Sequence, residues 1–167
     1  TGYEYVSYSF TADANYSLQK VEFYARYQGT PTSGNAVCYL YAADANKKPT
    51  GSILATSGNY DTSGLPASFG WITDMFTFAT PYALTSGTSY CIVIYYDGAD
   101  SSYMVTETSA NAGDKVKFAS TVAGLADYYT DKTGTMRLYS VSGYSHKVLG
   151  ITITKINGVT PVKVIGV

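Results

Sequence analysis

The sequence contains little charge and almost no histidine. Asp, Glu, Lys and Arg make up 14% of its 167 residues, and there is a single His, whereas about a quarter of an average globular domain is charged. A net charge of −1 gives no electrostatic attraction to nucleic acid, so we expect no nucleic-acid partner. One His and no Cys-x-x-Cys pair leave no zinc ligand set. We therefore expect neither a cofactor nor a metal centre.

Long apolar runs and catalytic motifs are also missing. No segment approaches the roughly 18 apolar residues that cross a bilayer, and the first residues, TGYEYVSYSF, have neither the basic nor the apolar part of a signal peptide. The motifs GxSxG, HExxH, GxGxxG and the P-loop are absent, and His146 alone forms no catalytic pair. We expect a protein that is not an enzyme and has no membrane span. Because the chain starts at Thr1 rather than Met, we also expect a processed, exported form.

What the sequence does contain is Tyr, of which there are 18, and many short segments of β-branched and aromatic residues. Turn-forming clusters such as QGTPTSG and NKKPTG separate these segments. The spacing predicts an all-β fold, an antiparallel sandwich of about nine strands in which alternate side chains enter a shared core. A short helical turn at 121–127 is an alternative in the weakest region. The expected strands are 3–12, 17–27, 35–44, 52–60, 71–79, 88–97, 102–108, 115–121 and 135–141.

Between Ser9 and Tyr139 the turns and aromatics follow a recognisable order. A strand ends in a Gly-x-Pro turn; later come KPTG, then W with two spaced Phe residues, then P-x-x-L-x-x-G-x-x-Y before an apolar strand. This pattern resembles a jelly-roll module found in phage tail and virion proteins and in prokaryotic surface proteins. The resemblance implies a jelly-roll-like sandwich and places Trp71 at the edge of the core. The matching residues are Gly29, Pro31, Lys48, Pro49, Thr50, Gly51, Trp71, Phe76, Phe78, Pro81, Leu84, Gly87 and Tyr90.

The last 24 residues differ from the rest of the chain. They contain an eight-residue repeat, KVLGITIT, KINGVTPV and KVIGV, and eight is a multiple of the two-residue strand period. We therefore predict a sandwich at 1–143 and a C-terminal β arm at 144–167. After residue 145 there are three Lys and no acid, a charge of +3 against −4 for the remainder. The repeated positions are Lys147, Lys155 and Lys163, with apolar Ile151, Ile153, Ile156, Val159, Val162 and Val164.

Two geometries fit this arm. Asn157-Gly158 favours a type I′ hairpin, but an isolated hairpin is marginal in water and its apolar face needs a cover. Alternatively, the arm extends and adds a strand to the next copy of the protein. The N-terminal segment YEYVSYSF is an alternative exchanged strand, and packing against the chain's own sandwich is the alternative to exchange.

Several single residues have two readings. Cys38 and Cys91 lie in strong strand signals and form either a disulfide or two small buried side chains. Asn15 begins an N-x-S glycosylation sequon. Asp97 and Asp100 offer oxygen ligands for calcium, although Asp is also a common turn former.

The sequence thus predicts an extracellular, cell-surface or virion structural subunit whose partners are copies of itself. The rival is a module that binds glycans or a host surface, because jelly rolls often present aromatic side chains that stack on sugar rings. The candidates for such stacking, next to loop-like segments, are Tyr95, Tyr96, Tyr103, Tyr128 and Tyr129.

Overall fold

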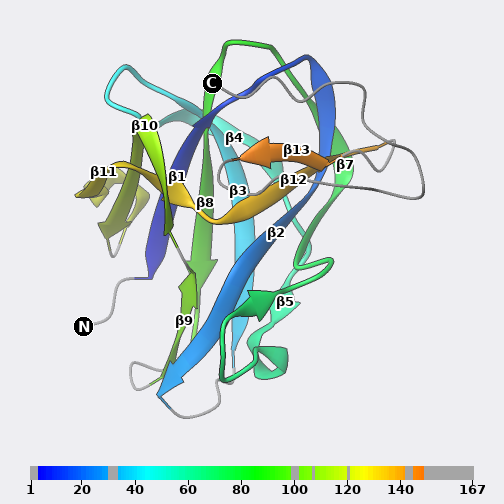
Figure 1. Cartoon of the computed structure of the whole chain (residues 1–167), viewed down its shortest axis with the longest axis vertical. Helices are drawn as coiled ribbons and strands as arrows, with labels where there is room; N and C mark the ends of the chain where they lie inside the picture. Colours follow the sequence, from blue (N-terminus) through cyan, green and yellow to red (C-terminus); the bar gives the residue numbers. More distant parts are fainter. Residues whose placement is uncertain are drawn as a thin grey trace.

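The computed structural model describes residues 4–29, 34–98, 102–106, 108–119, 121–141 and 145–148, with the backbone alone for β9, β11, β13 and nearly all of β10. Within these residues, the regular structure is β-strand apart from two single turns of 3-10 helix, η1 (Thr62–Gly64) and η2 (Val122–Gly124). The strands form two antiparallel sheets that pack as a sandwich (Figure 1). The predicted all-β sandwich is confirmed.

Among the described residues, one sheet contains seven strands and the other contains six. The seven-stranded sheet has the order β11 (Ala126–Gly134), β10 (Thr108–Ala119), β1 (Tyr5–Thr11), β8 (Ser89–Tyr96), β3 (Asn35–Ala43) and β4 (Pro49–Thr56), with β5 (Tyr60–Asp61) also paired to β3. The six-stranded sheet has the order β13 (Ser145–Val148), β12 (Met136–Ser140), β2 (Tyr16–Gly29) and β6 (Gly70–Trp71), with β7 (Phe76–Leu84) and β9 (Ser102–Thr106) also paired to β2.

The long strand β2 organises the six-stranded sheet. Its ladders with β12 and β7 both shift register between Leu18 and Lys20. Against β12, Gln19 is the extra residue of a bulge, whereas against β7 the additional residues, 78–81, lie on β7. The bulge resets the alternation, so that Leu18 and Val21 both face the core although they are three residues apart. Beyond it the strand keeps a two-residue period, and Glu22 points to the outer face.

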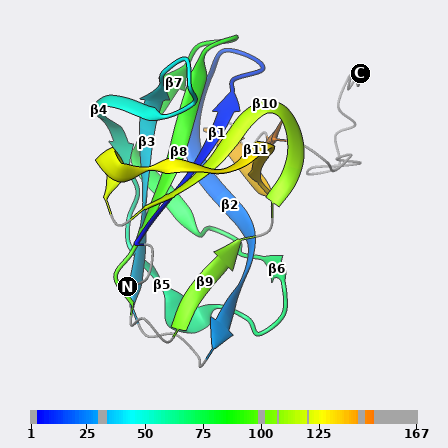
Figure 2. The same ribbon diagram turned by 90° about the vertical axis from the view of Figure 1, so that its left-hand side faces the viewer.

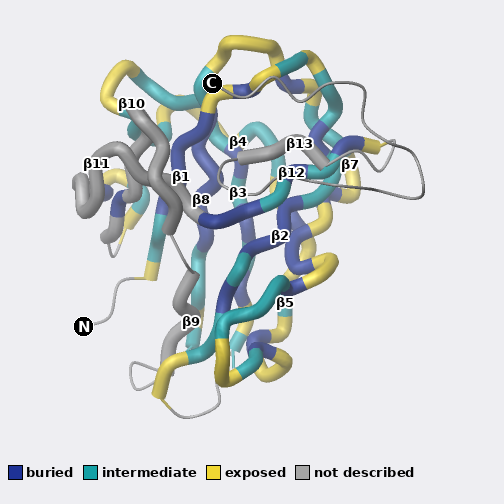
Figure 3. Tube along the Cα trace, viewed as in Figure 1, coloured by how far each residue is buried: buried dark blue, intermediate teal, exposed yellow. Residues whose placement is uncertain are grey.

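Aromatic side chains join the two sheets in the core. Tyr8 of β1 lies 5.2 Å from Phe23 of β2 between ring centroids, and Phe23 meets Phe76 of β7 edge-on at 6.2 Å. All three side chains are at least 98% buried. Burial of each such side chain contributes about 1.5–3 kcal/mol before entropy is counted. Figure 3 shows this buried layer along the centres of the strands, with exposed residues at the turns.

One corner of the sandwich is closed by backbone hydrogen bonds. The N–H of Ser57, just after β4, donates to Cys38 O of β3 at 2.9 Å, and the next N–H, of Gly58, donates to Thr77 O of β7 at 3.0 Å. This bridge fixes the two sheets relative to each other along that edge.

One end of the seven-stranded sheet folds back over the rest of that sheet. The β10–β11 hairpin, which continues the sheet from β1, crosses the outer face of its other strands (Figure 2), and Lys48 Nζ donates a hydrogen bond to Ala123 O in η2 at 2.7 Å. Cys91, Val93 and Leu125 are buried but lie outside the main core cluster. The sheet is therefore covered on both faces along part of its width.

Each of the nine segments predicted as strands overlaps a strand of the structure. The alternative turn at 121–127 corresponds to η2, which is followed by β11, a strand that the sequence did not indicate. The N-terminal segment, the alternative exchanged strand, forms β1, which pairs with β8 on one side and β10 on the other within its own chain.

Candidate binding and assembly surfaces

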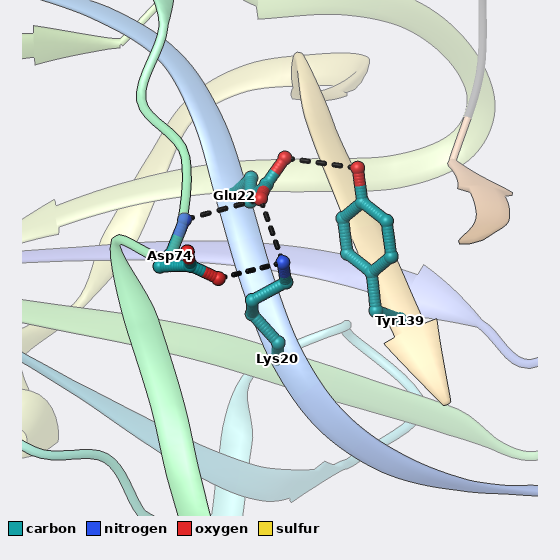
Figure 4. Close-up of polar contacts among 4 residues, drawn as sticks. All are labelled: Lys20, Glu22, Asp74 and Tyr139. Carbon is teal, nitrogen blue, oxygen red and sulfur yellow. Dashed lines mark hydrogen bonds and ion pairs between the residues drawn. The ribbon is translucent and has the colours of Figure 1, made fainter. Parts of the chain in front are cut away.

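Glu22 is the centre of a polar cluster on the outer face of the six-stranded sheet (Figure 4). Its side chain is 3% exposed and its Oε1 lies 3.0 Å from Lys20 Nζ. The same oxygen accepts a hydrogen bond from the backbone N–H of Asp74 at 3.1 Å, and Oε2 accepts one from the Tyr139 hydroxyl at 2.9 Å. Because both oxygens are satisfied, this charge is buried without the large penalty of an unpaired carboxylate.

The cluster shifts the titration of two neighbours. Burial lowers the pKa of Lys20, but its hydrogen bonds and charge attraction to Asp74 and Glu22 outweigh burial and raise that pKa overall. Burial, followed by the hydrogen bond to Glu22, raises the pKa of the Tyr139 phenol, and Arg137 offsets part of this effect. At neutral pH Lys20 is therefore charged and Tyr139 is a neutral hydrogen-bond donor.

Next to this cluster runs a stack that we call the arginine–aromatic row: Arg26, Phe69, Tyr24, Trp71 and Arg137. Tyr24 of β2 lies opposite Trp71 of β6 in the strand register, and the two ring centroids are 5.5 Å apart. On its other side, Tyr24 stacks on Phe69 at 5.8 Å with 13° between the ring planes. The guanidinium of Arg137 lies 3.8 Å from the Trp71 centroid, and that of Arg26 lies 5.0 Å from Phe69.

Neither arginine of the row forms an ion pair with a carboxylate of the described residues. Among the described residues, the ion pairs involve Lys20 alone, which engages both Glu22 and Asp74. Arg26 donates to Tyr27 O and Gln28 Oε1, which are both neutral. Within the same residues, neither the Tyr24 hydroxyl nor the Trp71 indole N–H has a hydrogen-bond partner. Arg137 interacts with the Tyr139 hydroxyl. The row therefore combines two arginines that form no ion pair among these residues with two further unused donors.

The sequence did not identify this row as a site. Trp71 was expected at the core edge, and this was wrong: the side chain lies outside the core cluster and stacks on the outer face. The Phe-Gly-Trp spacing was the available signal, since residues two apart share a face of an extended chain. Which strand they meet depends on register, which the sequence does not specify.

A second aromatic surface lies on the outer face of the seven-stranded sheet. Tyr95 of β8 is directly opposite Tyr5 of β1, and the rings are 4.9 Å apart. Burial, then the nearby Tyr95, Tyr39, Glu4 and Tyr41, raise the pKa of Tyr5. Tyr39, Tyr41 and Tyr95 face the same side, because Tyr39 pairs with Val93 and Tyr41 with Cys91.

The five tyrosines predicted to stack on sugars are not one platform in the part that is described. Tyr95 joins the outer surface just described, whereas Tyr96 pairs with the core residue Ala36 and so faces the opposite side. Tyr103 lies in β9, and Tyr128 and Tyr129 in β11, for which only the backbone is described.

The predicted C-terminal arm begins as a strand of the sandwich. Residues 145–148 form β13, which pairs with β12 and places Lys147 opposite Arg137. The sequence had suggested that β12 is the last strand of the sandwich, but β13 follows it. Residues 149–167 lie outside the described residues, and with them the other predicted assembly positions, Lys155, Lys163, Ile151, Ile153, Ile156, Val159, Val162 and Val164.

Of the two alternatives for Cys38 and Cys91, the structure confirms two small buried side chains rather than a disulfide, since both cysteines are free and buried. They lie on neighbouring strands, but Cys38 pairs with Ile94 and Cys91 pairs with Tyr41. An offset of three residues separates them by about 10 Å along the ladder and points them to opposite faces, beyond the roughly 7 Å that a disulfide spans.

The candidate polar residues of the loops are Asp97, Asp100 and Asn15. Asp97 Oδ1 accepts the backbone N–H of Asn35, and Asp100 lies outside the described residues. In the described part of the chain, no three acidic, Cys or His side chains gather as a metal site would require. Asn15 is exposed, and its Oδ1 accepts the Ser86 N–H at 2.7 Å.

No helix in the described ranges has the length and apolar character needed to cross a bilayer. Comparison of the chain with family models, curated proteins and solved structures found no match.

Proposed function

We propose that the protein is a non-catalytic structural subunit of an extracellular, cell-surface or virion assembly, and that copies join through the C-terminal arm. The observation that supports this most directly is the position of β13. It is the outermost strand in the order of the six-stranded sheet among the described residues, and the apolar repeat follows it in the sequence. The arm thus starts at a sheet edge, where unpaired backbone groups favour strand addition.

Burial of its apolar side chains favours binding of the arm to another surface. Six Ile and Val side chains of the repeat are each worth about 1.5–3 kcal/mol when buried, although ordering the backbone costs about 1–2 kcal/mol per residue. An arm of one copy seated on the body of the next is a head-to-tail contact, which forms rings or open filaments. The arm's charge of +3 against −4 for the body suits such a contact.

The resemblance to jelly-roll modules of phage tail, virion and prokaryotic surface proteins supports the same proposal. In the fold, the chain passes between the sheets repeatedly, as in β1 to β2, β2 to β3 and β7 to β8. We therefore propose a jelly-roll-like sandwich as its finer classification. Function does not follow from fold alone, so the test must address assembly itself.

The test compares the intact chain with a chain ending at Val148, which keeps all the described strands. We expect the intact chain to form multimers by light scattering and electron microscopy, and the truncated chain to remain monomeric with an unchanged melting curve. A full-length control with Ile151, Ile153 and Val162 replaced by Asn keeps the arm's length but removes apolar surface, and should also be monomeric. If the intact chain stays monomeric at high concentration, the assembly proposal is wrong.

A second candidate function is saccharide binding. It is favoured by the two aromatic surfaces, the tyrosines facing Tyr95 on one sheet and the arginine–aromatic row on the other. A glycan array carrying neutral and acidic saccharides tests it with the intact chain. Binding that survives in the variant truncated after Val148 supports a site on the sandwich, and an array without any binding rejects this candidate.

A further inference from the structure

The arginine–aromatic row has features of a prepared anion site. Arg26 and Arg137 are held at its two ends by contact with aromatic rings, 5.0 Å and 3.8 Å from the centroids. A guanidinium fixed against a ring loses less conformational freedom when it binds a carboxylate through two parallel hydrogen bonds. Neither arginine meets a carboxylate among the described residues, although the chain as a whole has a net charge of −1.

The nearby acids do not fill this role. Glu22 pairs with Arg137 in the strand register, yet its carboxylate is turned to Lys20, Asp74 and Tyr139. Asp74 is bound to Lys20 at 2.8 Å. Lys20 pairs with both acids but its single charge balances only one of them. Together with Arg26 and Arg137 this group has three positive and two negative charges, so a net charge of +1 favours an anionic ligand.

The other groups of the row indicate the rest of the ligand. The Tyr24 hydroxyl and the Trp71 indole N–H are hydrogen-bond donors and are unused among the described residues. They suit a ligand with many oxygen acceptors and widely spaced negative charges. Single-stranded nucleic acid fits less well, since its charge density calls for a groove rich in Lys and Arg, and the body before residue 146 has a charge of −4.

We propose that the arginine–aromatic row binds an acidic saccharide, with Arg137 and Arg26 holding carboxylate groups and Tyr24 and Trp71 contacting the sugar. The proposal rests on the second candidate function and adds to it the surface and the charge class of the ligand. The row runs from Arg26 past three rings to Arg137, so it suits several consecutive sugars better than a single one.

The experiment uses Trp71 as its reporter, because it is the only Trp of the chain. The intact protein is titrated with oligogalacturonate, with the same oligosaccharide after methyl esterification, and with a single-stranded oligonucleotide, while Trp fluorescence is recorded. We expect a saturable change with oligogalacturonate that weakens with added salt, and a much smaller change with the other two. Equal binding of the esterified form, or tighter binding of the oligonucleotide, would overturn the proposal.

Variants locate the site. Arg137→Gln and Arg26→Gln should each weaken binding about tenfold, since a hydrogen bond to a charged group contributes about 1.5–3 kcal/mol. Lys48→Gln is the matched control, because it removes one positive charge at the other sheet, where Lys48 contacts Ala123 O. Arg137→Lys keeps the charge without the planar fork and should be intermediate. Thermal melts check that each variant folds.

The outcomes separate the proposals from each other. If oligogalacturonate binding is lost in Tyr95→Ala but kept in Arg137→Gln, saccharide binding stands and the row is the wrong surface. If neither titration nor array detects a saccharide, the row proposal and the second candidate fall together. The assembly proposal is unaffected in both cases, because multimer size decides it.

Discussion

At the scale of single residues, two serines at equivalent positions of β1 differ in whether their buried side chains have an interaction partner. Ser7 and Ser9 point to the outer face of the seven-stranded sheet, and both are fully buried. Within the part of the chain that the structure describes, the Ser7 hydroxyl has no hydrogen-bond partner, whereas Ser9 has an interaction partner. Ser7 lies between Val93 and Lys117 in the strand register. Its hydroxyl loses its hydrogen bonds to water on folding, and no hydrogen bond in the described structure compensates for them.

We predict that Ser7→Ala raises the free energy of unfolding by about 1 kcal/mol, because a buried unsatisfied hydroxyl is removed. Ser9→Ala is the matched control on the same face of the same strand and should lower it by about the same amount. Urea denaturation of both variants measures the difference. A loss of stability in Ser7→Ala as large as that in Ser9→Ala would show that the Ser7 hydroxyl is hydrogen-bonded in solution.

The inward residues of β2 were predictable from sequence, but its outward residues were not. Val21, Phe23 and Ala25 alternate as expected and are fully buried. Glu22 reads as a solvent-facing residue in that alternation, yet it is 2% exposed. Its burial depends on Asp74 and Tyr139, which are 52 and 117 residues away in the chain, and a pattern along one strand contains no information about such partners.

At the scale of elements, register explains the main errors of the sequence interpretation. The strand signals around Cys38 and Cys91 were correct and the two strands are neighbours, but side-chain patterns do not state which residues lie opposite one another. The same holds for Tyr24 and Trp71, whose contact creates the arginine–aromatic row. Strand β11 was missed because its segment, ADYYTDKTG, lacks a run of β-branched residues and is held as a strand by its neighbours. β13 falls within the predicted β arm, but its pairing with β12 was not predicted.

The free cysteines give a prediction at this scale. The melting temperature should be the same with and without a reducing agent, because no bond links β3 to β8. Two thiols per chain should react with a thiol reagent in denaturant and much more slowly in the folded protein, since burial raises the pKa of Cys38 and suppresses its reactive thiolate. A lower melting temperature in reductant, or fewer than two thiols in denaturant, would contradict the register.

At the scale of the whole molecule, the fold divides its polar chemistry between the two outer faces. In the seven-stranded sheet, the β10–β11 hairpin folds back over part of the outer face, and the uncovered part of that face displays tyrosines. The six-stranded sheet displays charged residues and the arginine–aromatic row, and its edge leads into the C-terminal arm. Sequence alone indicated the sandwich and singled out the arm, because both depend on local patterns. The two aromatic surfaces could be located only in the folded arrangement.

The tyrosines make the stability of the whole sandwich sensitive to alkaline pH. Burial is the largest cause that raises the pKa of Tyr5, Tyr16, Tyr41, Tyr60 and Tyr139. In the unfolded chain these phenols titrate near pH 10, so the folded state holds its protons more tightly. Their contribution to stability is therefore complete below about pH 10 and is lost as the pH rises through the folded-state pKa values.

We predict that tyrosinate absorbance rises in two stages as the pH is raised. Exposed tyrosines should ionise near pH 10, and the buried ones should ionise later, together with the loss of β-sheet circular dichroism. Tyr41→Phe should delay that loss, because one of the groups that resist ionisation is gone, while the chain in urea should titrate in one step. If all the tyrosines of the native chain ionise in a single step near pH 10 with the sheets intact, burial does not hold these protons and the packing assigned to them is wrong.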